Sequence, residues 1–195
     1  MIIIGIAGYK NSGKSTFGSH LSKHFSNNMN RVVTYAPFAR PLKLLCQAVF
    51  GDAHWWGTDE QKSKVVAYWS EVLGEEFSTA RRILQTVATD KFRNTINKDI
   101  WIHAQRVYLK QLGAPDVVIV DDVRFENEAD FIRNSGGSLI HISRLDTQAH
   151  RDAHESEAGV VKKDTDYSFA FLTVAAMDVT ITNLTQQLIK KQAKL

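Results

Sequence analysis

One short segment near the start of the chain has the residue types and the spacing of a phosphate-binding loop. The segment Gly8–Ser15, GYKNSGKS, matches the pattern of glycine, four residues, glycine, lysine and then serine or threonine. Glycines let the backbone curl until successive peptide N–H groups point at phosphate oxygens. A lysine at this place reaches the β- and γ-phosphates, and the serine hydroxyl binds a magnesium ion that bridges them. The segment therefore predicts binding of a nucleotide together with Mg²⁺.

The individual residues of this loop have different expected roles. Lys14 is expected to bind the terminal phosphates and Ser15 the metal, while a backbone role is favoured for Lys10 and Ser12. Thr16 is a candidate for the α-phosphate, with a hydrogen bond at the helix start as the competing role. The competing interpretation of the whole segment is a glycine-rich turn with a solvated lysine, which the agreement of every fixed position disfavours. The predicted nucleotide-binding residues are Gly8, Asn11, Ser12, Gly13, Lys14, Ser15 and Thr16.

A second group of candidate residues follows a buried apolar run. Asp121 and Asp122 come directly after the run 117–120, and ligands sit at the carboxyl ends of strands in open parallel sheets. One of them should face the magnesium ion, and Asp122 is the predicted metal ligand; helix capping is the alternative for either one. Arg124 can bind an anion, and the carboxylate of Glu128 can orient it.

The surrounding pattern predicts the elements that position these residues. β-branched and apolar runs predict strands over 1–7, 31–35, 116–122, 138–142 and 179–182. Apolar residues three and four apart predict helices over 14–26, 41–50, 61–73, 79–95, 99–112, 126–134 and 184–193, with Pro41 as the first residue of its helix. Alternating strands and helices indicate an α/β three-layer sandwich with a mainly parallel sheet. We expect a single domain over 1–195, with a helical insert over about 38–112 and a polar lid over about 144–166.

Composition limits the class of protein. The chain has 195 residues, of which 44% are hydrophobic, and a single cysteine, so an internal disulfide scaffold is excluded. We expect a cytoplasmic protein without a leader or a membrane span. The net charge of +3 suits either a nucleic-acid partner or cations gathered around a small anion, and the expectation is a small-molecule ligand and no nucleic acid.

Several segments resemble one known family in the same order along the chain. The segment Asp122–Ala129, DVRFENEA, resembles a motif of the bacteriophage deoxynucleoside monophosphate kinases, and Phe38–Lys43 is similar to that family's segment after the second strand. At position 40 the family commonly has aspartate and this chain has arginine. The similarity extends to residues 81–85, 89–90, 93 and 100–102, which look like acceptor-binding helices, and to His154–Glu157 in the lid.

The resemblance implies a phosphate-binding-loop kinase fold and transfer of the γ-phosphate of ATP to a deoxynucleoside monophosphate, giving the diphosphate. It implies catalytic roles for Lys14, Asp122, Arg124 and Glu128. The predicted acceptor-binding residues are Lys43, Arg81, Arg82, Gln85, Asp90, Arg93, Trp101, Arg124, Glu128 and the lid residue Arg151. Arg144 is the second lid candidate, and Asn183, expected just after the last strand, is a candidate for the adenine edge of the donor.

Some alternatives stay open on sequence alone. Adjacent arginines on a helix cannot face the same way, so at least one of Arg81 and Arg82 is expected to be structural. Trp101 can be a stacking surface for a base or a core anchor. A kinase acting on a nucleoside or sugar hydroxyl would need a base, for which Asp59 or Asp90 could serve, and a nucleotide-dependent switch is a further rival. The apolar helices of the insert could also pair across a symmetric homodimer.

Overall fold

The structure is a computed structural model that describes residues 1–51, 56–144, 165–171 and 173–193. Within these residues the chain forms two compact units. Unit 1 comprises residues 1–37 and 108–195, and unit 2 comprises residues 38–107. Each unit is described by itself below.

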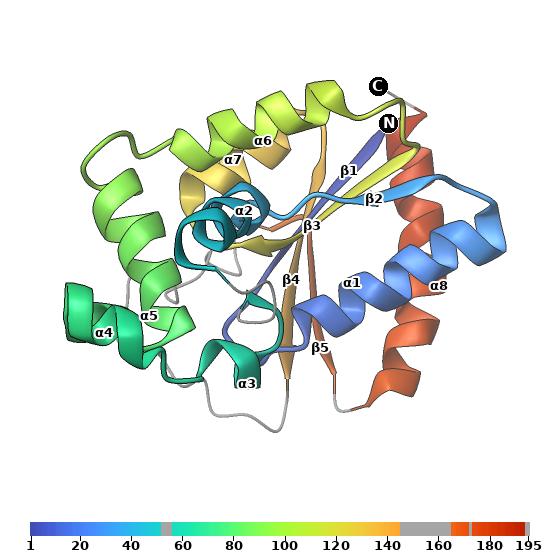
Figure 1. Cartoon of the computed structure of the whole chain (residues 1–195). Coiled ribbons are helices and arrows are strands. Elements are labelled where there is room, and N and C mark those ends of the chain that lie inside the picture. Colours follow the sequence, from blue (N-terminus) through green and yellow to red (C-terminus); the bar gives the residue numbers. More distant parts are fainter. Residues whose placement is uncertain (52–55, 145–164, 172, 194–195) are drawn as a thin grey trace. The chain divides into compact units, whose positions relative to one another are not determined.

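Unit 1 contains a five-stranded sheet in the order β2-β3-β1-β4-β5, in which every neighbouring pair is parallel (Figure 1). The strands are β1 (Ile2–Ala7), β2 (Val33–Tyr35), β3 (Val117–Val123), β4 (Ser138–Arg144) and β5 (Tyr167–Phe171). β1 lies at the centre, between β3 and β4, which explains its continuous run of buried apolar residues. The prediction of an α/β fold with a mainly parallel sheet is confirmed.

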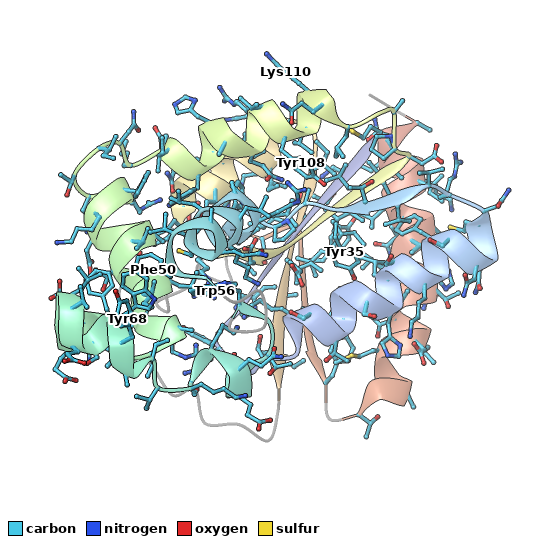
Figure 2. The ribbon with its side chains drawn as sticks, viewed as in Figure 1. Tyr35, Phe50, Trp56, Tyr68, Tyr108 and Lys110 are labelled. Atoms are coloured by element: carbon cyan, nitrogen blue, oxygen red, sulfur yellow. The ribbon has the colours of Figure 1, made fainter. Side chains whose placement is uncertain are left out.

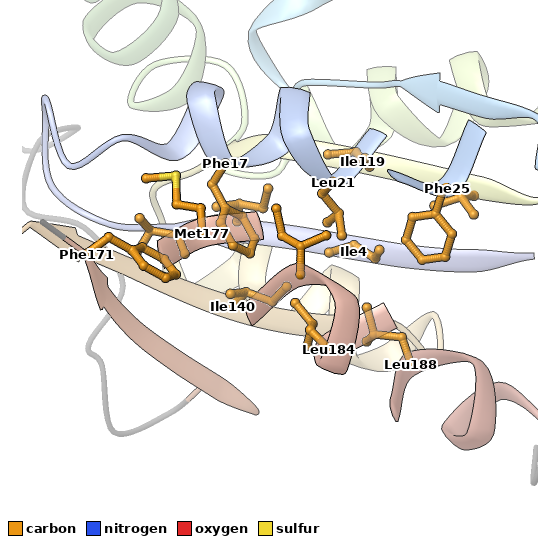
Figure 3. Close-up of a cluster of buried hydrophobic side chains, with 14 residues drawn as sticks. Ile4, Phe17, Leu21, Phe25, Ile119, Ile140, Phe171, Met177, Leu184 and Leu188 are labelled. Atoms are coloured by element: carbon orange, nitrogen blue, oxygen red, sulfur yellow. The ribbon is translucent and has the colours of Figure 1, made fainter. Parts of the chain in front are cut away.

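Helices cover both faces of this sheet. α1 (Lys14–Lys23), its π-helical continuation η1 (His24–Asn28) and α8 (Val174–Gln192) enclose the main apolar core on one face (Figure 3). Phe17, Leu21 and Phe25 recur every fourth residue and are fully buried there. On the other face α7 (Glu126–Asn134) approaches so closely that a Cβ added to Gly5 would lie 3.0 Å from Ile132 Cγ1. Unit 1 thus has three layers.

The C-terminal part of unit 1 differs from the prediction. The predicted strand over 179–182 is wrong, because these residues lie in the middle of α8. The buried residues Met177, Ile181, Leu184 and Leu188 are spaced four, three and four apart, which is a helical stripe. The last strand is instead β5, which lies at the edge of the sheet beside β4 and falls in the segment 167–177 that had no assigned structure.

Unit 2 is helical. Its elements are α2 (Ala39–Phe50), α3 (Asp59–Lys62), α4 (Ala67–Leu73), η3 (Glu75–Phe77), α5 (Ala80–Gln85), the π-helix η4 (Thr86–Arg93) and α6 (Ile100–Gln111), whose last residues belong to unit 1. The predicted helix over 61–73 is two helices, because Val65 forms an isolated bridge with Thr79 between them. Pro41 is the third residue of α2 and not the first, a place where its missing N–H costs no helical hydrogen bond.

The core of unit 2 combines aliphatic side chains with large aromatic ones. Trp56, Phe77 and Trp101 are buried in one cluster with the only cysteine, Cys46. Burial raises the pKa of the Cys46 thiol to about 12, so this thiol is neutral and unreactive in the folded state. No helix within the described ranges combines the length and the apolar character that crossing a membrane requires.

Candidate functional site

The loop between β1 and α1 has a backbone that glycine alone can supply at its start. Gly8 has φ +147°, and a Cβ placed there would lie 2.2 Å from the carbonyl oxygen of Ile142. Gly13 has φ +91° and adopts the left-handed conformation directly before α1. Asn11, with φ +61°, is also left-handed, a conformation that asparagine tolerates better than most residues. These positive φ angles give the curled loop that the motif predicts.

Lys14 and the first turn of α1 concentrate positive charge at this loop. The ammonium group of Lys14 donates hydrogen bonds of 2.7 Å to the carbonyl oxygens of both Gly8 and Tyr9. Ser15 and Thr16 follow in the first helical turn, and both are exposed. Peptide N–H groups of a first turn have no partner inside their own helix, and the helix dipole adds to their attraction for anions.

Ser12 differs from the other loop residues because it is turned inward. Its N–H donates to the carbonyl of Tyr9 at 3.1 Å, and its side chain is 4% exposed. Its hydroxyl oxygen would lie 2.7 Å from a Cβ on Gly8. The Ser12 N–H thus serves the turn itself, and the role of Ser12 toward a ligand stays a prediction.

The two aspartates lie in a β-bulge of β3. Gly5 pairs with Val120 and Ala7 with Val123, so three steps along β3 oppose two steps along β1. Neither aspartate caps α7, because that helix begins at Glu126 and the residue before it is Phe125. The helix-capping alternative is thus excluded for both.

Asp121 faces the helix that follows the phosphate loop. Its Cβ lies 3.5 Å from the place where a Cβ on Gly18 would be, and Gly18 is on α1 three residues after Ser15. Asp122 is half-buried in the same bulge. Burial raises the pKa of Tyr35, with a further contribution from the negative charge of Asp121, so the Tyr35 phenol beside α1 stays neutral.

Glu128 acts on the backbone at Arg124. It is 4% exposed, and its Oε2 accepts hydrogen bonds from the N–H groups of Arg124, at 2.8 Å, and Phe125, at 3.1 Å. A carboxylate at the start of α7 also interacts favourably with the helix dipole. Glu128 thus holds the main chain at Arg124, and this is how it can orient that residue. The same hydrogen bonds cap α7.

In unit 2 the two adjacent arginines of α5 have different environments. Arg81 donates to the carboxylate of Asp59 at 2.9 Å, and Lys62 lies 3.1 Å from the same oxygen. Arg82 is exposed, and within the described residues its backbone N–H donates to the hydroxyl of Thr79. Arg81 is therefore the member of the pair with a structural ion pair, and Arg82 stays the candidate for an anion.

The remaining acceptor candidates lie on three helical segments of unit 2. Lys43 on α2 and Gln85 on α5 are half-buried. In the π-helix η4, Asp90 is exposed, and Arg93 donates to the carbonyl of Lys98 at 3.0 Å. Wide π-helical turns occur frequently at functional sites.

Of the two roles left open for Trp101, a stacking surface and a core anchor, its position favours the core anchor. Its side chain is 9% exposed, its indole N–H donates to the Ala88 carbonyl at 3.0 Å, and its ring packs on Phe92 with centroids 5.4 Å apart. A base cannot stack on a ring buried in this way. Trp101 is a core anchor of unit 2.

Comparison with known proteins identifies the family. A family model described as deoxynucleotide monophosphate kinase matches residues 59–170. A protein of Acanthamoeba polyphaga mimivirus, provisionally named deoxynucleotide monophosphate kinase, is 36% identical over 169 residues, covering 80% of this chain and 81% of its own length. The chain belongs to the deoxynucleotide monophosphate kinase family.

Phage enzymes of this family match over a shorter stretch. The deoxynucleotide monophosphate kinase of Enterobacteria phage T4 is 32% identical over 47% of this chain, and the deoxynucleoside-5'-monophosphate kinase of Escherichia phage T5 is 29% identical over 45%. These matches span 39% and 37% of the two phage proteins. A shikimate kinase structure from Aquifex aeolicus aligns over 98% of both chains with a TM-score of 0.43 and 15% identity, a likeness too distant to bear on the assignment.

Three further predicted site residues are Asn183, Arg144 and Arg151. Asn183 does not end a strand as expected; it is exposed within α8. Arg144 is the last residue of β4. Arg151 and most of the predicted lid, including 154–157, lie outside the described residues.

The oxygen groups around α1 suit the magnesium ion that the phosphate-binding loop predicts. Magnesium prefers hard oxygen ligands and is usually bound by one or two protein groups together with substrate phosphates. The hydroxyl of Ser15 and the carboxylate of Asp121 are such groups, and Asp121 approaches α1 at Gly18, three residues after Ser15. The residues present therefore fit the ion.

Sequence reasoning missed Gly18 and Tyr35. Gly18 carries a signal, since a glycine inside a helix usually marks a close approach. Tyr35 ends the second strand, at the edge of the sheet where ligands bind, but the pattern of that strand does not distinguish this residue from its neighbours.

Proposed function

We propose that this protein transfers the γ-phosphate of ATP to a deoxynucleoside monophosphate and forms the diphosphate and ADP. The observation that carries the proposal is the curled loop Gly8–Ser15, with Lys14 bound across it, in a chain of this family. The donor's phosphates would bind the N–H groups of Gly13, Lys14, Ser15 and Thr16 and the ammonium group of Lys14.

For the magnesium ion we propose Ser15 and Asp121 as the protein ligands, in place of the predicted Asp122. The reason is the 3.5 Å approach of Asp121 to the Cβ position of Gly18, one helical turn after Ser15. The ion supplies neutralisation of charge on the transferred phosphoryl group. Asp121→Asn should weaken Mn²⁺ binding to the ADP complex, measured by electron paramagnetic resonance, more than Asp122→Asn does.

The acceptor needs cations more than it needs a base. A phosphate monoester is already largely ionised near neutral pH, so positioning and charge neutralisation suffice. Within unit 2, Arg82 is the arginine proposed for this purpose, with Lys43, Gln85, Asp90 and Arg93 as further contacts. The acceptor role of Arg124 stays a prediction from the sequence.

A kinase that acts on a hydroxyl acceptor needs a general base, and Asp59 is poorly suited to this role. Burial raises the pKa of Asp59, but hydrogen bonds from Lys62 and Arg81 and their charges outweigh this effect and lower it overall. A carboxylate held in this way is a weak base. Asp59 is therefore a poor candidate for the base that a nucleoside kinase needs.

The test follows the label of [γ-³²P]ATP in the presence of magnesium and each of the four deoxynucleoside monophosphates. We expect labelled deoxynucleoside diphosphate with at least one of them, and none with the matching nucleosides. Label released as inorganic phosphate at the same rate with and without acceptor would overturn the proposal and favour a nucleotide-dependent switch. Light scattering on the same preparation measures the oligomeric state, for which the sequence left a homodimer open.

A further inference from the structure

A small polar group lies between α1 and the carboxyl ends of two strands of unit 1. It consists of Gly18 and Ser22 on α1, Tyr35 at the end of β2 and Asp121 in β3, and we call it the α1 seam. The inference concerns this seam and rests on the proposed use of Ser15 and Asp121 for magnesium. Figure 2 shows Tyr35 between β2 and α1.

Tyr35 and Asp121 lie on the same face of the sheet. Tyr35 pairs with Ile119 in the parallel ladder of β2 and β3, and Ile119 belongs to the core under α1. Asp121 lies two residues beyond Ile119 in the bulge of β3. Its Cβ is 3.5 Å from the Cβ position of Gly18 on α1, which places it on the α1 face as well.

Gly18 allows both side chains to reach the helix. A Cβ at this residue would lie 3.3 Å from the Tyr35 hydroxyl and 3.5 Å from the Cβ of Asp121. The Tyr35 oxygen is also hydrogen-bonded to Ser22, four residues further along α1. Ser15, Gly18 and Ser22 are spaced three and four apart, so they form one stripe along the helix.

We propose that Tyr35 is a positioning residue for Asp121. The Tyr35 hydroxyl is hydrogen-bonded to Ser22 and lies beside Gly18, so Tyr35 covers the part of the stripe between these two residues. Asp121 is then confined to the part of α1 that leads to Ser15. Tyr35 itself touches neither nucleotide nor metal in this role.

The variant that tests the role is Tyr35→Phe, which keeps the ring and removes the tie to Ser22. The measurement is ADP binding by isothermal titration calorimetry, with and without Mg²⁺, and the quantity of interest is the gain in affinity that magnesium gives. We expect this gain to fall about three- to tenfold, the size of one lost hydrogen bond, while ADP affinity without magnesium is unchanged. Tyr167→Phe, on β5 of the same unit, is the matched control and should leave the gain as it is.

A double-mutant cycle shows whether Tyr35 acts through Asp121. In an Asp121→Asn background, Tyr35→Phe should cause no further loss, because the side chain that it positions no longer carries charge. Gly18→Ala, which crowds both side chains, should reduce the magnesium gain at least as much as Tyr35→Phe does.

Two results would overturn the inference. One is a magnesium gain in Tyr35→Phe equal to that of the unchanged protein; the other is an equal loss of affinity with and without magnesium, which indicates general packing. Failure of the unchanged protein to bind ADP at all would be a different result, since it would remove the proposed function and this inference together.

Discussion

The two units hold their polar groups in different ways. Unit 1 has a core of aliphatic and phenylalanine side chains against a parallel sheet, and its candidate site is built from backbone geometry at a loop and from side chains at the ends of strands. Unit 2 has a core that includes the two tryptophans Trp56 and Trp101, and its candidate ligand groups are side chains on helices. The proposed anion binding in unit 1 would therefore depend on the shape of the main chain, whereas in unit 2 it would depend on which side chains the packing leaves available.

The largest effect expected in unit 1 is that of Lys14→Ala. The ammonium group is bound to the carbonyls of Gly8 and Tyr9 and lies where the terminal phosphates are proposed to bind. Loss of such a preorganised cation should lower kcat on the order of a thousandfold, with the unfolding midpoint nearly unchanged. Lys23→Ala, an exposed lysine at the end of the same helix, is the control. Normal turnover by the Lys14 variant would contradict the assignment of the loop.

Trp101→Ala should instead be a stability mutation. The side chain is 9% exposed, packed on Phe92 and hydrogen-bonded to Ala88. Its removal should cost about 3–5 kcal/mol in the free energy of unfolding, measured by chemical denaturation. A stable variant that has lost only its affinity for the acceptor would restore the stacking role and weaken the contrast between the units.

The adjacent arginines of α5 give an internal comparison within unit 2. Arg82→Ala should raise the KM for the deoxynucleoside monophosphate roughly 10- to 100-fold, as expected for a lost charge-assisted hydrogen bond. Arg81→Ala should leave this KM nearly unchanged, because Arg81 is occupied by Asp59. Steady-state kinetics on the two variants decides the point, and the reverse order of effects would assign Arg81 to the ligand.

The smallest expected effect is a pH dependence that arises from Asp59. Its pKa is lowered by Lys62 and Arg81 against an opposing effect of burial, so its contribution to stability is present above the unfolded value of about 3.9 and is lost as pH falls toward the lower folded value. The difference in Tm between the unchanged protein and Asp59→Asn should therefore be larger at pH 6 than at pH 3. A difference independent of pH would show that the ion pair contributes nothing; Asp90→Asn is the control.

The segments that the sequence predicts best are those whose residue types are dictated by the conformation of the main chain. The loop Gly8–Ser15, β1, β3 and α7 were all expected near their observed bounds, because glycine spacing and long apolar runs reflect main-chain requirements directly. The segment 179–182 was predicted as a strand because its four β-branched residues alternate between apolar and polar. The buried stripe that makes it helical extends well beyond it in both directions.

Side-chain roles on helices could be predicted only in part. That one of Arg81 and Arg82 must be structural followed from their adjacency, but the choice required the position of Asp59, a residue of another helix. In the same way, the choice between Asp121 and Asp122 depended on the bulge in β3, which leaves no pattern in the sequence. It also depended on the approach to Gly18, a helical glycine that signals a close contact without showing which residue makes it.

The central claim is that the turn between β1 and α1 binds the phosphates of the nucleotide. The most direct measurement is a ¹H–¹⁵N correlation spectrum recorded during titration with MgADP. We predict that the largest amide shift changes fall on Gly8 to Thr16, and that they disappear in Lys14→Ala. Saturable binding with these amides unmoved and the largest changes elsewhere would contradict the account.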